Sequence, residues 1–239
     1  MNRKAIVAGQ FYESSFNLLD KQIRNCFEDK LGPGDLPIKK RTKKIFGVVA
    51  PHAGYQFSGQ CAAWSYKEIA EAEFPDLYII IGVNHTGLGS EISTYLFSDW
   101  ETPLGIVKVD KDSGNKLIKK FPTLKNETLS HINEHSIEVQ LPFLQFVNKD
   151  KIKELKFLPI LVNSWDYELC KNLGKAISSI NKNICVIASS DFTHYGLNYS
   201  YVPFTKNVKE NLYNLDKKAI DFIKDLDAEK FLDYVRREQ

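Results

Sequence analysis

The sequence lacks several features that mark particular classes of protein. It has no apolar run long enough to span a membrane, and its first apolar stretch is too short for a secretory signal. Lys+Arg 32 against Asp+Glu 30 gives a net charge of +2, so no basic excess indicates nucleic-acid binding. The run from Lys39 to Lys44 is a local exception that we interpret as a solvated loop. We therefore expect neither a membrane span nor a nucleic-acid partner.

Cysteine is scarce, and the four cysteines, Cys26, Cys61, Cys170 and Cys185, show no paired spacing. We predict reduced, buried thiols and a cytoplasmic protein. The chain also lacks both standard phosphate loops and a G-x-S-x-G nucleophile elbow. No repeat or linker divides its 239 residues, of which 43% are hydrophobic. We expect a single domain over residues 1–239.

What the sequence does contain is three apolar runs that each lead to a histidine. Residues 46–50, 77–83 and 184–188 have the composition of strands buried on both faces. His52, His85 and His194 follow them. Helical patterns alternate with these strands, which predicts an α/β fold with a mostly parallel central sheet and helices on both faces. Because ligands bind at the carboxyl ends of such strands, the three histidines are expected to line one cleft.

Other elements are predicted from periodicity and capping residues. A further strand is expected over 155–161, and residues 91–95 and 105–109 are expected to form an extra β-pair. The predicted helices cover residues 16–28, 61–73, 110–120, 136–147, 165–180, 205–226 and a last segment to 237. Their expected caps are Ser14 or Ser15, Ser58, Asp110 or Asp112, Ser136, Ser164 and Asp227.

The histidines indicate metal chemistry, because neutral imidazole binds Fe, Zn, Cu and Ni. Two histidines make an incomplete site, so a third ligand is needed. Asp191, three residues before His194, is a candidate for that ligand, for a group that orients an imidazole, or for a turn cap.

A second pattern supplies a rival hypothesis. His131-Ile-Asn-Glu-His135 matches H-x-x-E-H, a zinc-peptidase signature that requires a helix. Here it lies at a predicted helix start, and no partner carboxylate follows. We interpret it as a chance match, and a zinc peptidase using His131 and His135 is the less favoured alternative.

Several stretches also resemble the Memo family, whose bacterial and archaeal members are often called AmmeMemoRadiSam system protein B. They lie in order over nearly the whole chain. The matching stretches are Ala8-Gly-Gln-Phe-Tyr12, Ala50-Pro-His-Ala-Gly-Tyr55, Asn84-His-Thr-Gly-Leu-Gly89, Trp100-Glu-Thr-Pro-Leu-Gly105, Glu134-His-Ser-Ile-Glu-Val-Gln-Leu-Pro-Phe143 and Ala188-Ser-Ser-Asp-Phe-Thr-His-Tyr195.

The resemblance implies a fold similar to that of the class III extradiol ring-cleaving dioxygenases, which hold non-haem iron. It implies that His52 and His85 are metal ligands and that His194 is an acid/base or substrate-contacting residue. It places Asp191 beside His194 in the catalytic set, and Tyr12 and His135 among the substrate-binding residues. Iron is the implied metal and copper the alternative.

The sequence departs from the family at its end. Memo proteins carry a late Cys-Gly motif whose cysteine replaces the dioxygenase carboxylate, and this chain ends at Gln239 before such a motif. We expect that the family's C-terminal segment is lacking, through trimming or through loss of part of the site.

Two functional classes therefore remain. One is a binding protein that keeps a metal and a small-molecule or peptide ligand in a dioxygenase-like scaffold. The other is a metal-dependent oxidoreductase in which His194 moves a proton. The absent ligand favours the first. The sequence does not indicate the oligomeric state.

Overall fold

The structure, a computed structural model, describes residues 2–38 and 41–238. By its contacts the chain divides into two compact units. The first comprises residues Met1–Ser164 and Gly174–Ser190, and the second comprises Trp165–Leu173 and Asp191–Gln239. The prediction of one domain over the whole chain stays a prediction. Residues 39 and 40 of the predicted basic loop lie outside the described residues.

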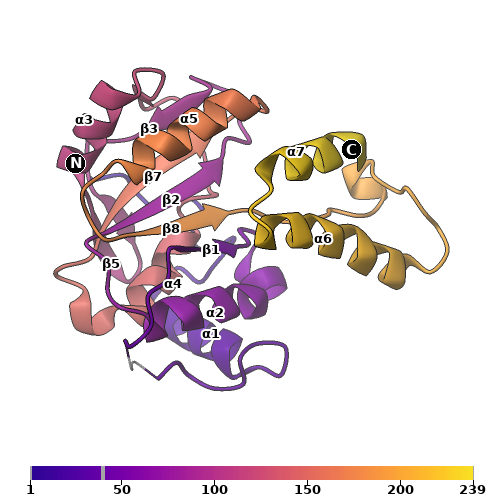
Figure 1. Cartoon of the computed structure of the whole chain (residues 1–239). Coiled ribbons are helices and arrows are strands. Elements are labelled where there is room, and N and C mark those ends of the chain that lie inside the picture. The colour runs from indigo at the N-terminus through magenta and orange to yellow at the C-terminus, as the bar shows by residue number, and fades with distance from the viewer. Residues whose placement is uncertain (1, 39–40, 239) are drawn as a thin grey trace. The chain divides into compact units, whose positions relative to one another are not determined.

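The first unit is built on a mixed, mostly parallel sheet, which confirms the predicted α/β fold (Figure 1). Strands β1, β8, β2 and β7 lie side by side in that order, all parallel. β7 also pairs with β3, in antiparallel orientation, and with β5, in parallel orientation. β6 pairs with β3, and β4 pairs with β5. The strands are β1 Gly47–Ala50, β2 Leu77–Val83, β3 Ile92–Thr94, β4 Trp100–Thr102, β5 Gly105–Val109, β6 Lys125–Asn126, β7 Lys156–Val162 and β8 Ile184–Ser189.

The register brings the carboxyl ends of three strands to one edge of the sheet. Ala50, the last residue of β1, pairs with Ser189, the last residue of β8. On the other side of β8, Ile81 pairs with Ala188, so β2 ends at the same level. The loops after β1 and β2 therefore start close together, as the sequence predicted.

Two predictions about the strands were wrong. β1 is not buried on both faces: of its four residues only Ala50 is buried, and Phe46 just before it is 77% exposed. Within the part of the chain that the structure describes, β1 is an edge strand that pairs with β8 alone. The strands at 91–95 and 105–109 do not pair with each other. β3 and β5 each pair with β7 instead. The additional antiparallel pair is formed by β5 with β4. A hydrophobic run does not reveal which strand it will lie beside.

Helices cover both faces of the sheet (Figure 1). On one face α1 (Phe16–Glu28), α2 (Tyr55–Glu71) and α4 (Gln140–Val147) contact one another. On the other face lie α3 (Lys111–Lys120) and the carboxyl-terminal part of α5 (Tyr167–Ser178). A short 3₁₀ turn, η1 (Lys149–Lys151), follows α4. The core consists of the apolar residues of β2 and β7 together with the inner faces of these helices.

Helix starts depended on contacts that sequence patterns do not contain. Ser15 and Asp110 cap α1 and α3 as predicted. α2, however, begins at Tyr55 rather than near Cys61. Ser58 therefore lies inside the helix and does not cap it, and its hydroxyl group donates to the Ala53 carbonyl. The early start is stabilised because the Tyr55 N–H donates to a carbonyl of the N-terminal segment, 2.7 Å away.

Two further predicted caps were wrong. α4 begins at Gln140 after a series of turns, and the Ser136 hydroxyl group donates to the carbonyl of Val83 instead of capping a helix. α5 begins at Tyr167, where the Asp166 carboxylate, not Ser164, accepts a hydrogen bond from an N–H of the first turn.

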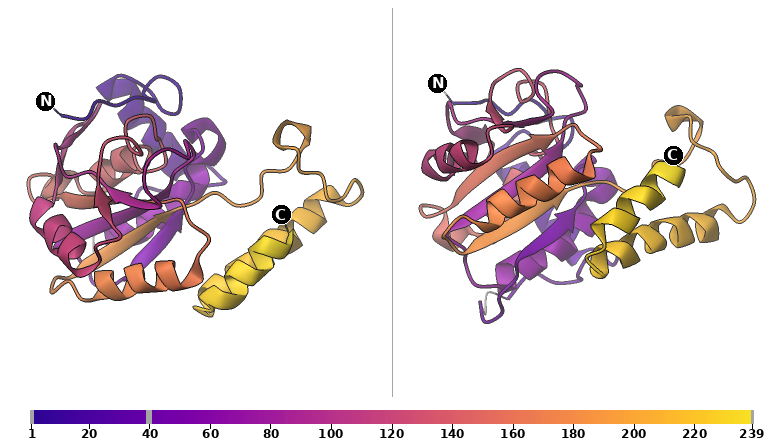
Figure 2. Two further views of the ribbon diagram at one scale, coloured as in Figure 1. Left: turned by 90° about the horizontal axis from the view of Figure 1, so that it is seen from above. Right: turned by 45° about the horizontal axis from the view of Figure 1, so that its top comes forward.

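The second unit contains an antiparallel helix pair, α6 (Val208–Lys224) and α7 (Ala228–Glu238), which lie side by side in both views of Figure 2. Asp227 caps α7 as predicted. The Tyr234 ring packs on Phe222 of α6, and its hydroxyl group donates to the Leu215 carbonyl. A 3₁₀ turn, η2 (Leu197–Tyr199), precedes the pair.

The cysteine prediction held for two residues out of four. Cys26 and Cys185 are buried, whereas Cys61 and Cys170 are exposed because they lie on the outward sides of α2 and α5. Of the helices in the described residues, none combines the length and the apolarity needed to cross a membrane.

Candidate metal centre

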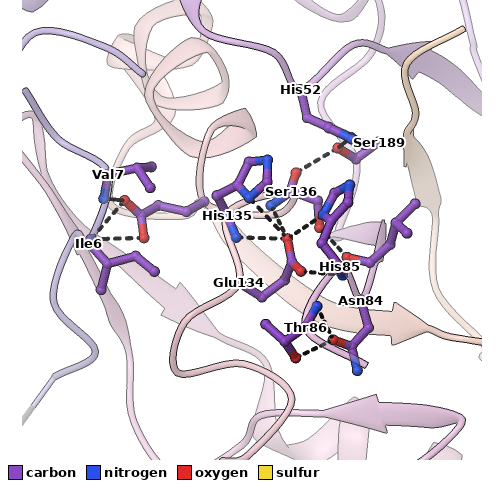
Figure 3. Close-up of polar contacts among 12 residues, drawn as sticks. Ile6, Val7, His52, Asn84, His85, Thr86, Glu134, His135, Ser136 and Ser189 are labelled. Atoms are coloured by element: carbon purple, nitrogen blue, oxygen red, sulfur yellow. Dashed lines mark hydrogen bonds and ion pairs between the residues drawn. The ribbon is translucent and has the colours of Figure 1, made fainter. Parts of the chain in front are cut away.

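Three histidines of the first unit converge at the carboxyl edge of the sheet (Figure 3). His52 follows β1, His85 follows β2, and His135 lies in the irregular segment before α4. Each offers a ring nitrogen, and these nitrogens all lie within 4.8 Å of one another. The rings of His85 and His135 are stacked, with centroids 4.8 Å apart, and the His52 ring meets both edge-on. The group could hold a metal ion.

The orientation of His52 is set by a buried hydroxyl group. Its Nδ1 lies 3.0 Å from the Ser189 Oγ at the end of β8. That hydroxyl group donates its single hydrogen to the Ser136 carbonyl, 2.5 Å away, and accepts from the side-chain amide of Gln140. Since the hydroxyl hydrogen is already used, Ser189 accepts from His52, and Nδ1 carries the proton. The lone pair of this imidazole is therefore on Nε2.

His85 and His135 are both organised by Glu134, which Figure 3 shows between them. The carboxylate of Glu134 accepts from the backbone N–H of His85 at 2.6 Å, and from those of His135 and Ser136 at 2.8 Å each. It also lies 3.0 Å from Nδ1 of His85 and 3.4 Å from Nδ1 of His135. One carboxylate thus joins two segments that lie 49 residues apart in the chain.

These contacts keep Glu134 ionised although its side chain is 2% exposed. Burial alone raises the pKa of the carboxyl group, but the hydrogen bonds from His85 and the backbone amides outweigh burial and lower the pKa to about 2. An ionised carboxylate only accepts, so Nδ1 of His85 donates and Nε2 holds the lone pair. This is the arrangement by which a carboxylate orients a metal-binding histidine.

The donor set fits a first-row transition metal. Neutral imidazole is a good ligand for iron, copper, zinc and nickel. A tetrahedral ion with metal–nitrogen distances of about 2.1 Å places its ligand nitrogens about 3.4 Å apart, so the most widely separated nitrogens, up to 4.8 Å apart here, have to approach by up to about 1.4 Å. The His85 side chain is 42% exposed, which leaves the cluster accessible from solvent, whereas His52 is buried.

The loop that carries His85 is held by side-chain hydrogen bonds. The side-chain oxygen of Asn84, Oδ1, accepts hydrogen bonds from the backbone N–H and the hydroxyl group of Thr86. The side-chain nitrogen of Asn84, Nδ2, donates to the Leu88 carbonyl at 2.7 Å. Gly82 permits the close approach of the segment before α4, since a Cβ atom there would lie 2.6 Å from the Ser136 Oγ. The loop is therefore fixed on both sides of the histidine.

The zinc-peptidase hypothesis is not supported by the position of His131. Residues 131–135 form turns rather than a helix, so His131 and His135 do not share a helix face. His131 is fully buried, and its Nε2 lies 3.1 Å from the Ser93 Oγ. Burial lowers the pKa of this imidazole to about 3. Within residues 2–38 and 41–238, no metal-ligating group includes His131.

Tyr12 packs in the interior of the first unit. Its side chain is 2% exposed, and its hydroxyl group donates to the Glu138 carboxylate at 2.8 Å. Burial next to this carboxylate raises the pKa of the phenol well above its ordinary value. A role of Tyr12 in binding substrate stays a prediction.

Asp191 and His194 belong to the second unit. The Asp191 carboxylate lies 3.4 Å from Nε2 of His194, whose ring stacks on Tyr199 with centroids 4.9 Å apart. The carboxylate therefore lies where it can orient the imidazole, one of the roles foreseen for it. Their catalytic roles stay predictions.

Sequence reasoning identified His52 and His85 by their positions after strands, and it assigned His135 to ligand binding rather than to the metal-ligating group. It missed Glu134 and Ser189 as supporting groups. A usable signal was present for Glu134, because an acidic residue next to a histidine is a candidate for orienting an imidazole. Nothing in the sequence pairs Ser189 with His52, because their contact depends on the strand order.

Comparison with known proteins identifies the family. The Memo-like protein family matches residues 3–239. A MEMO1 family protein of Methanopyrus kandleri is 41% identical over 242 residues, which cover 99% of this chain and 81% of the relative. One from Pyrococcus furiosus is 42% identical, with 96% and 78% covered, and one from Nitrosopumilus maritimus is 39% identical, with 97% and 78% covered. The chain belongs to the Memo family.

Proposed function

We propose that this protein binds a redox-active metal ion, iron or alternatively copper, at His52, His85 and His135. The observation that carries the proposal is the convergence of three imidazoles. The Nδ1 atom of His52 faces the buried Ser189 hydroxyl group, and the Nδ1 atoms of the other two face the Glu134 carboxylate. Such outer contacts fix the ring orientation and increase ligand basicity. Three imidazoles would leave coordination positions for a small-molecule or peptide ligand, and we place the protein in the cytoplasm.

A metal bound there would supply Lewis acidity and access to a second oxidation state. The chain's own residues have separate tasks. Glu134 and Ser189 hold the proton on Nδ1 of their histidines and so keep each Nε2 ready to coordinate. The partial exposure of His85 gives a ligand access to the cluster, and the burial of His52 excludes water from its inner side.

A metal-dependent oxidoreductase is the second candidate, favoured by the pair of Asp191 and His194. A carboxylate that orients an imidazole is a common arrangement for proton transfer. In this candidate His194 would exchange a proton with the substrate, and the fold would resemble the extradiol dioxygenases. Oxygen consumption with catechol-type substrates separates the two candidates: turnover lost in His194→Gln supports the oxidoreductase, and no turnover in the metal-loaded protein supports a binding protein.

The proposal is tested by elemental analysis of protein purified anaerobically. We expect close to one iron or copper ion per chain in the parent and loss of that metal in the double variant His52→Ala/His85→Ala and in His135→Ala. His131→Gln is the matched control, because an amide nitrogen can replace Nε2 beside Ser93. Metal lost in His131→Gln but retained in His135→Ala would contradict the proposed ligand set. Stoichiometric zinc instead of iron or copper would overturn the redox assignment.

A further inference from the structure

A buried arginine near the N-terminus contacts the segment that carries Glu134 and His135. Arg3 is 7% exposed. Its Nε and Nη2 donate to the His131 carbonyl at 3.1 and 3.0 Å, and Nη2 also donates to the Glu134 carbonyl at 2.7 Å. These partners lie about 130 residues further along the chain, so the contact is a product of the fold.

The charge of Arg3 is balanced in place. Its Nη1 donates to the fully buried carboxylate of Glu138 at 2.7 Å. The same carboxylate accepts from the backbone N–H groups of Ile6 and Val7. The guanidinium carbon lies 3.9 Å from the centre of the Trp100 ring, a cation–π contact. The N-terminal segment is thus bonded at several points to residues 131–138.

Glu134 connects this buried group to the histidine cluster. Its carbonyl is held by Arg3, and its carboxylate holds the amides of His85 and His135 and faces Nδ1 of His85. The backbone and the side chain of Glu134 are therefore both held by hydrogen bonds. A shift of the Glu134 backbone would move the carboxylate that orients two of the three imidazoles.

We propose that Arg3 is a positioning residue for the metal centre, holding the segment 131–138 so that Glu134 and His135 meet His85 in ligating geometry. The inference rests on the proposed function, since it assumes that the cluster binds metal. A guanidinium group is required because its planar fork reaches two carbonyls and a carboxylate at once. A lysine would keep the charge opposite Glu138 but not the fixed geometry.

The test compares Arg3→Lys with Lys4→Gln. Lys4 is the next residue, but its ammonium group pairs with Glu101 in an exposed ion pair. Co²⁺ is titrated into the metal-free proteins and followed by its visible absorption. We expect the Kd for Co²⁺ to rise about 10-fold in Arg3→Lys with a changed ligand-field spectrum, within the range for loss of an outer contact. Lys4→Gln should behave like the parent.

A second variant protects the test against a folding defect. Arg3→Met/Glu138→Gln removes both buried charges, so neither is left uncompensated. It also lacks the donors to the carbonyls of His131 and Glu134, and we expect the same loss of Co²⁺ affinity as in Arg3→Lys. Parent-like Kd values and spectra in both variants would overturn the proposal.

Amide hydrogen exchange in the metal-free proteins separates this inference from the proposed function. If Arg3 positions Glu134, the N–H groups of His85, His135 and Ser136 should exchange faster in Arg3→Lys than in Lys4→Gln. If the parent binds no metal at the histidines, the proposed function fails. Faster amide exchange in Arg3→Lys than in Lys4→Gln would still support the positioning role of Arg3. Unchanged exchange at all three amides would contradict it.

Discussion

Replacing Glu134 by glutamine should reveal how strongly one carboxylate stabilises the histidine cluster. The pKa of Glu134 falls from 4.5 to about 2 in the folded protein, because the donors around it outweigh its burial. One pKa unit corresponds to about 1.4 kcal/mol, so the ionised carboxylate contributes about 3 kcal/mol to the free energy of unfolding at neutral pH. Glutamine has nearly the same shape but no charge, and we expect the variant to lose most of this contribution.

The pH dependence gives the prediction its sign. A carboxyl group whose folded pKa is depressed stabilises the fold fully above its unfolded pKa of 4.5, and the contribution is lost as the pH falls toward about 2. The difference in stability between parent and Glu134→Gln should therefore be largest at pH 7 and smaller by roughly 1 kcal/mol or more near pH 3.5.

Urea denaturation at several pH values, with a chelator present, measures this difference directly. Glu101→Gln is the matched control, because Glu101 is a solvent-exposed carboxylate that pairs with Lys4, and its replacement should change stability far less. A stability difference for Glu134→Gln that stays constant from pH 7 to about pH 3.5 would refute the assignment of a depressed pKa.

Three other predictions follow from contacts around the cluster. Ser189→Ala leaves the Nδ1–H of His52 without its acceptor, so metal affinity should fall about 10-fold in a chelator-competition titration; an unchanged affinity would contradict the role of the hydroxyl group. Gly82→Ala places a Cβ atom 2.6 Å from the Ser136 Oγ and should cost about 1–3 kcal/mol, measured as a lower Tm, whereas Gly174→Ala, which meets no atom within 4 Å, should not destabilise. Iodoacetamide should modify the exposed thiols before the buried ones, whose pKa burial raises to about 11 and about 12, and peptide mass spectrometry gives the order. The exposed thiols are Cys61 and Cys170, and the buried thiols are Cys26 and Cys185.

The part of the site that depends on local patterns could be predicted from the sequence. His52 and His85 each follow an apolar run, and the rule that parallel strands end at a common edge brings them together without knowledge of the strand order. The alternation of strands and helices was likewise enough to predict a mostly parallel sheet. These inferences succeed because hydrophobic periodicity and chain direction determine them.

The rest depended on contacts between residues far apart in the chain. His135 joins the cluster through Glu134, which binds residues near position 85, and no local pattern of residues 131–139 contains that information. Ser136 has the side chain of a helix cap, but its hydroxyl group is taken by the Val83 carbonyl, and α4 starts four residues later. The role of Arg3 was not foreseen for the same reason, since its partners lie more than 120 residues away.

The position of β8 has a consequence for the order in which the protein matures. Among the strands of residues 2–38 and 41–238, β8 comes last in sequence, yet it lies between β1 and β2. In the described residues β1 has β8 as its one neighbour, so it stays unpaired until residue 189 has left the ribosome. Contacts of such sequence separation form late in folding. His52 receives the Ser189 hydroxyl group in the same step, so the contact that orients this histidine forms only after residue 189 has been synthesised.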